Sequence, residues 1–108
     1  MANPNLQGIV VYNRIGDGCL NGIWTNNLSG GRIMNECARK KDTDITCLAG
    51  EYTVTWIDEN HGITNGTLEI VRDNLVYNLT WKEGKTTLFY GIGIDCKETT
   101  FSAAFWEA

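Results

Sequence analysis

Short segments of alternating apolar and polar residues recur along the whole sequence, and clusters of Gly, Asn and Asp separate them. The segments are rich in β-branched and aromatic residues, which suit a half-buried strand, while the separating residues tolerate positive φ or hydrogen-bond their own backbone. This alternation of apolar segments and turn residues predicts eight β-strands. They are Gln7–Arg14, Cys19–Asn26, Arg32–Arg39, Gly50–Asp58, Gly62–Val71, Asn74–Glu83, Thr87–Ile94 and Thr99–Glu107.

The links between these strands indicate how the sheet closes. All are of hairpin length except Lys40–Ala49, where we expect an irregular loop or, alternatively, a short helix. Eight antiparallel strands can form a sandwich or a barrel, but a regular hairpin order without a long crossover favours a barrel, which also leaves no unpaired edge. We therefore expect an all-β fold, an eight-stranded antiparallel up-and-down β-barrel.

The length and charge of the chain limit the classes of function. We expect one barrel domain, residues 1–108, in which 1–6 form a leader. A net charge of −4 argues against the basic footprint of nucleic-acid binding. We therefore expect no nucleic-acid partner. Because we find neither an apolar run of about 20 residues nor a signal-peptide pattern, we expect no membrane span.

The alternation also assigns an inward face to most strands. An eight-stranded barrel is just wide enough to fill with side chains or to hold one small ligand. Four glycines would leave room beside the aromatic rings: Gly22, Gly66, Gly91 and Gly93. The sequence therefore fits both a ligand cavity and a packed core. It does not decide which face of the last two strands points inward. The residues expected inside are Leu20, Gly22, Trp24, Tyr52, Val54, Trp56, Leu75, Tyr77, Leu79 and Trp81.

The segment Gly22–Leu28 reads Gly-Ile-Trp-Thr-Asn-Asn-Leu and resembles the Gly-x-Trp-Thr-Asn-x-Leu segment of avidins. Gly-x-Trp is also the signature of lipocalins, and both families are calycins, which are ligand-binding barrels. Tyr52–Trp56 is similar to the avidin strand that supplies a biotin-contacting tryptophan. The resemblance implies that Asn26 and Leu28 match pocket positions at the closed end and that Trp56 matches the stacking tryptophan.

A second resemblance covers more of the chain. Several segments look like ones that recur, in shifted order, in small bacterial barrel proteins of poorly known function. They are Val10–Tyr12, Asp17–Trp24, Gly30, Gly31, Glu36, Leu48–Val54, Gly66–Ile70 and Gly91–Ile94. This resemblance implies the fold and almost no activity.

Few residues in the sequence could catalyse a reaction. His61, the only histidine, stands in a turn where we expect an exposed loop residue. Glu36 lies on a strand with two plausible faces, and an inward Glu36 among aromatic rings would have a raised pKa and could act as a general base. We expect the opposite face, formed by Ile33, Asn35 and Cys37, to point inward, which would leave Glu36 in water.

The cysteines Cys19, Cys37, Cys47 and Cys96 lack the spacing of a metal site, so we expect no metal and no cofactor. A hairpin folded about Leu28 would place Cys19 opposite Cys37, and the up-and-down order brings Cys47 and Cys96 to the same rim. Two disulfides are therefore allowed, and they would indicate a secreted or periplasmic protein. Four thiols in a cytoplasmic protein fit the sequence as well.

Two functions from different classes follow, and an enzyme is third. The first is a non-catalytic binding protein that holds a small apolar or aromatic ligand inside the barrel, with Asn26 or Glu36 as a polar anchor. The second is a filled barrel that forms homo-oligomers through an outer patch such as Ile23, Val76 and Tyr90. A small barrel cyclase or isomerase would use Glu36 as its base. The ligand-binding candidates are Trp24, Asn26, Leu28, Tyr52, Trp56, Tyr77 and Trp81.

Overall fold

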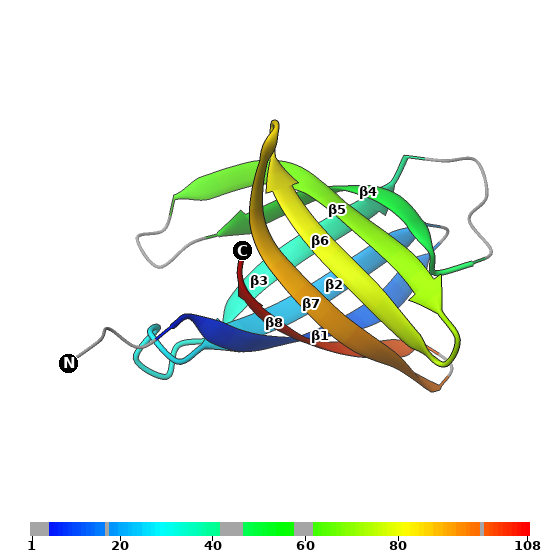
Figure 1. The fold of residues 1–108 in the computed structure, drawn as a ribbon, viewed down its shortest axis with the longest axis horizontal. Coiled ribbons are helices and arrows are strands. Elements are labelled where there is room, and N and C mark those ends of the chain that lie inside the picture. Colours follow the sequence, from blue (N-terminus) through cyan, green and yellow to red (C-terminus); the bar gives the residue numbers. More distant parts are fainter. Residues whose placement is uncertain (1–4, 17, 42–46, 58–61, 98) are drawn as a thin grey trace.

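The computed structural model describes residues 5–16, 18–41, 47–57, 62–97 and 99–108. The chain forms eight antiparallel strands in sequential order, and β8 pairs with β1 to close the barrel, as Figure 1 shows. The predicted eight-stranded up-and-down barrel is therefore confirmed. The strands are β1 (Gln7–Gly16), β2 (Cys19–Asn26), β3 (Met34–Lys40), β4 (Gly50–Ile57), β5 (Ile63–Asp73), β6 (Val76–Glu83), β7 (Thr86–Lys97) and β8 (Thr100–Glu107).

Two of the hairpin turns show why the chain reverses where it does. Asn74, between β5 and β6, has a φ of 57°, and Gly84, between β6 and β7, has a φ of 60°. Asparagine and glycine tolerate this left-handed region better than other residues do. Both turns lie where the sequence predicts them. His61 and most of the expected loop or helix within Lys40–Ala49 lie outside the described residues.

The inward faces of β2, β4 and β6 agree with the alternation, except that Leu75 lies in the β5–β6 turn and is 86% exposed. The expected face of β3 is wrong, because this strand buries its other face. Gly22 on β2 pairs with Glu36, and directly opposed residues point to the same side of a sheet, so inward Gly22 brings Glu36 inward. The buried residues of β3 are Met34, Glu36, Ala38 and Lys40.

Five glycines on the inner face leave space that aromatic rings of the same chain occupy. A Cβ atom on Gly22 would lie 2.8 Å from the Tyr12 ring, a distance that real Cβ atoms do not adopt. The room expected beside the glycines is therefore taken by side chains. The pairs are Gly8 with Phe105, Gly22 with Tyr12, Gly66 with Trp56, Gly91 with Trp81 and Gly93 with Phe101.

The two ends of the barrel differ in the residues that they carry. At one end β1 begins and β2 finishes, and Trp24 and Trp56 point inward there; we call it the tryptophan end. At the other end β1 finishes and β3 reaches Lys40; we call it the lysine end. The tryptophan end lies at the left of Figure 1 and the lysine end at the right.

Candidate functional site

A single carboxyl group is buried among the aromatic side chains of the described interior. Glu36 is 6% exposed and stands between Gly22 on β2 and Trp56 on β4. Because Gly22 has no side chain, Tyr12 crosses over it from β1 and donates a hydrogen bond from its hydroxyl to Glu36 Oε2. The Trp81 side chain also lies close enough to the carboxyl group to favour its charged form. Three polar groups from three strands therefore meet inside an apolar barrel.

Burial controls the protonation of this group. It raises the pKa of Glu36 from 4.5 to about 7, although the hydrogen bond from Tyr12 and the nearby Trp81 side chain favour the charged form and lower it. Burial also raises the pKa of Tyr12 well above 10, and the nearby charge of Glu36 raises it further. Tyr12 thus remains a hydroxyl donor, while Glu36 exchanges a proton near neutral pH. It can accept a proton or pair with a cation or a hydrogen-bond donor.

Aromatic rings gather around Phe105 between this carboxyl group and the tryptophan end. Phe89 contacts Phe105 in a T-shaped arrangement with ring centroids 5.6 Å apart, and Trp24 does so at 6.4 Å. The Trp81 ring lies 5.8 Å from Phe105, so one side chain links the rings to Glu36. Trp24 and Phe89 are only partly buried. We call Trp24, Trp81, Phe89 and Phe105 the Phe105 cluster.

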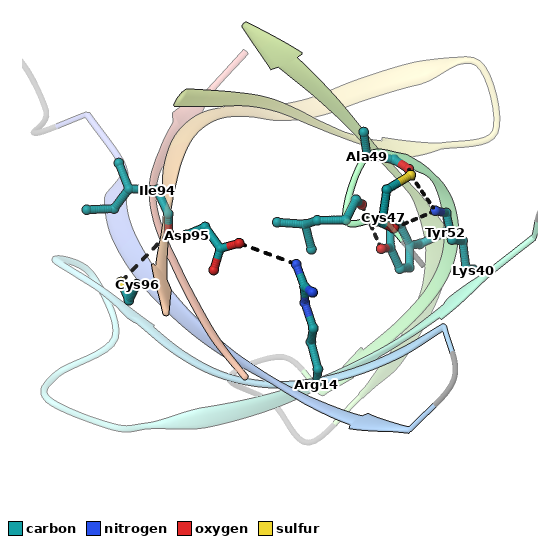
Figure 2. A network of polar contacts seen from close by, with 9 residues as sticks. Arg14, Lys40, Cys47, Ala49, Tyr52, Ile94, Asp95 and Cys96 are labelled. Atoms are coloured by element: carbon teal, nitrogen blue, oxygen red, sulfur yellow. Dashed lines mark hydrogen bonds and ion pairs between the residues drawn. The ribbon is translucent and has the colours of Figure 1, made fainter. Parts of the chain in front are cut away.

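Polar contacts cover the lysine end instead. Lys40 is 8% exposed, and its Nζ donates to the backbone oxygen of Cys47 over 2.6 Å. The Tyr52 hydroxyl donates to the backbone oxygen of Leu48 over 2.7 Å. Figure 2 shows these contacts together with Arg14, which reaches the Asp95 carboxylate across 3.5 Å. The side chains that close this end already have partners within the chain.

The structure separates the predicted ligand residues into three groups. Trp24, Trp56 and Trp81 lie around or beside Glu36 and toward the tryptophan end. Tyr52 and Tyr77 lie closer to the lysine end, where Tyr77 packs edge-on against Phe101. Asn26 ends β2, and its side-chain oxygen accepts a hydrogen bond from the backbone of Leu28, which is 46% exposed. These last two residues shape the β2–β3 turn.

Tyr12 and Phe105 were missed as site residues by the sequence reasoning, although both lie on expected strands. In the first strand, Val10 and Tyr12 alternate with Ile9 and Val11, so hydrophobicity does not separate its two faces. Phe101 and Phe105 stand four residues apart, a period that places both rings on one side of β8. That spacing is the signal that could have found Phe105.

The expected pairing of Cys19 with Cys37 is wrong. Cys19 pairs with Arg39 and Cys37 pairs with Asn21, because the β2–β3 hairpin is centred on Ser29 and not on Leu28. No disulfide joins the described cysteines. In the described ranges, no group of three or more His, Cys, Asp or Glu residues could hold a metal ion.

The chain matches no protein-family model, no curated protein and no solved structure. Within the ranges that the structure describes, no helix has the length and apolar character needed to span a membrane. The function has to be argued from the chemistry of the site, because a fold alone does not specify one.

Proposed function

We propose that this protein is a non-catalytic binding protein that takes a small aromatic ligand carrying a hydrogen-bond donor or a positive charge. The observation that carries the proposal is the Glu36 carboxyl group, which is buried beside an aromatic cluster. A buried ionisable group is costly in an apolar interior, and groups with strongly shifted pKa values are concentrated at functional sites. In this proposal Glu36 is the polar anchor and the Phe105 cluster supplies the stacking surface.

The chemistry of the cluster defines the ligand class. Indole and phenyl faces attract flat rings and cations, and a cation over such a face gains further when water is excluded. Trp24 and Phe89 are the partly buried members, so their rings are the ones whose rotation would admit a ligand. The ligand would reach Glu36 past Trp81, which touches both parts of the site.

The Gly22–Trp24 segment lends a weaker kind of support. The segment resembles one of avidins and lipocalins, which are calycin barrels that hold small ligands. In this chain, Gly22 and Trp24 lie on the inner face of β2. Such a likeness favours a ligand in the barrel without specifying which one.

The test uses two phenyl probes of opposite charge, phenethylamine and phenylacetate, which do not absorb where indole is excited. We expect phenethylamine to shift the tryptophan emission of the wild-type protein and phenylacetate to do so far less. Binding of the amine should strengthen as the pH rises through about 7, because Glu36 becomes charged. Glu36→Gln should weaken the amine at least about tenfold, since it removes a buried charge partner.

Glu69→Gln is the matched control, because Glu69 is an exposed carboxylate on β5. It should leave the titration unchanged. The proposal fails if neither phenethylamine nor a wider panel of aromatic amines alters the emission, and if native mass spectrometry finds no co-purified small molecule.

A further inference from the structure

A contiguous area of the outer surface, spread over four of the eight strands, carries no charge. β6, β7, β8 and β1 are neighbours, and each contributes three consecutive outward positions to this area. A solvated surface holds about 25–35% charged residues, so three or four would be expected among these twelve positions, yet none is Asp, Glu, Lys or Arg. We call this area the uncharged face. Its ranges are Val76–Thr80, Tyr90–Ile94, Ser102–Trp106 and Gln7–Val11.

The large apolar side chains of the uncharged face are well exposed. Ile9 is 58% exposed and Ile94 54% exposed, and Tyr90, Ile92 and Trp106 each exceed 40%. Ile23 on β2 extends the area, because it pairs with Val11. Single exposed apolar residues are ordinary, whereas a contiguous group of this kind marks an interaction surface.

A groove runs along β8 in the middle of this face. Ser102 and Ala104 form its floor, while Ile92 and Ile94 on β7 and Ile9 on β1 stand on either side. Two adjoining hollows, of about 480 and 550 Å³, share Ile9 and Ala104 in their linings. Small residues between two isoleucine ridges therefore produce a concave, apolar strip.

The opposite side of the barrel is different. Arg39, Glu51 and Glu69 are exposed on the outward faces of β3, β4 and β5. These charged side chains therefore lie on the side of the barrel away from the groove. This asymmetry indicates that the uncharged face is covered in the working protein.

We propose that the occupant is a second copy of this chain, packed face to face about a twofold axis that runs between β7 and β8. The closed barrel offers no strand edge, so the copies associate through a sheet face. A twofold interface needs a self-complementary surface, and this axis sets the β7 isoleucines of one copy over the β8 groove of the other. Each copy has a net charge of −4, but no charged residue lies on the uncharged face, so this contact opposes no like charges.

The area is adequate for a stable dimer. Ile9, Tyr90, Ile92, Ile94 and Trp106 together expose roughly 500 Å² of side chain at ordinary residue areas. A standard interface buries about 800 Å² per partner. The remaining outward positions, including Ile23 and Val76, supply the difference. The contact lies on the outer face of the barrel, whereas Glu36 faces the interior, so the two proposals are tested separately.

Sedimentation velocity of the full chain over a wide dilution series tests the proposal. The wild-type protein should show twice the 12.0 kDa mass of the chain at high concentration and should dissociate on dilution. Ala104→Arg places a charge on the groove floor and should raise the dimer Kd at least about 100-fold. Ile92→Glu removes a ridge and should act in the same direction.

Ile57→Arg is the matched control, since Ile57 is also an exposed outward isoleucine but stands on β4, across the barrel from β8. It should leave the Kd unchanged, and circular dichroism reports whether each variant is folded. A wild-type monomer at every concentration, or an assembly that Ala104→Arg and Ile92→Glu weaken no more than Ile57→Arg does, overturns the proposal. Failure here leaves the ligand titration of Glu36 unaffected.

Discussion

The buried carboxyl group of Glu36 predicts an unusual dependence of stability on pH. Its pKa is about 7 in the folded protein and ordinary in the unfolded chain, so the folded state binds a proton more tightly. A group with a raised folded pKa adds stability that is complete below its unfolded pKa, near 4.5, and is lost as the pH rises through about 7. Raising the pH from 5 to 8 should therefore destabilise the barrel.

The rise of the Glu36 pKa from 4.5 to about 7 gives the size of this effect. A tenfold change in proton affinity corresponds to about 1.4 kcal/mol, so the whole contribution is about 3 kcal/mol, most of it between pH 5 and pH 8. That is a large share of the net stability of a small domain, which is about 5–15 kcal/mol. Glu36→Gln should abolish the dependence, because an amide keeps the shape of the side chain but does not ionise.

Urea denaturation followed by tryptophan emission measures this difference directly. The free energy of unfolding of the wild-type protein and of Glu36→Gln is compared at several pH values between 5 and 8. His61 and the four cysteines are common to both proteins, so the difference between the two curves isolates Glu36. Parallel curves would refute the reasoning, because they would show that Glu36 titrates alike in the folded and unfolded states.

Three further substitutions or reactions test the interior and the cysteines. Tyr12→Phe should cost about 2 kcal/mol at pH 8 and less at pH 5 in urea denaturation, since its hydroxyl bonds the charged carboxylate most strongly. Gly22→Ala should cost about 1–3 kcal/mol in the same assay by crowding the Tyr12 ring, whereas Gly16→Ala, with open space around it, should be near neutral. Maleimide without reductant should label all four cysteines of the denatured chain by mass spectrometry; two adducts or fewer would indicate disulfides.

The barrel could be predicted from the sequence because its signals are local. Strand period and turn residues act within a few positions of one another, and β4 alternates Tyr52, Val54 and Trp56 inward with threonines outward. The exact centre of a hairpin is harder to predict, because it depends on how the two strands pair and not on the turn residues alone. The β2–β3 link lies one residue beyond its expected centre, and this small displacement moves Cys19 from Cys37 to Arg39.

The filled interior could not be predicted from any one strand. Each inward glycine accommodates a ring from elsewhere in the chain, as Gly66 does for Trp56 across β4 and β5. Glycine on an inner face therefore indicates either a cavity or a ring from a neighbour, and only the register distinguishes the two. The uncharged face has the same origin, because it becomes contiguous only when β8 closes against β1.

The inward position of Glu36 could nevertheless have been predicted from the sequence. The expected register of the β2–β3 hairpin conflicts with the expected inward face of β3. A hairpin folded about Leu28 opposes Leu20 to Glu36, and Leu20 is expected inside, so Glu36 should point inward as well. The observed centre at Ser29 opposes Gly22 to Glu36 and keeps the same side, since the displacement moves the register by two residues. Hydrophobicity within β3 favours neither face strongly, whereas pairing with β2 decides it. Combining the register with the alternation identifies the buried carboxyl group on which the proposed site depends.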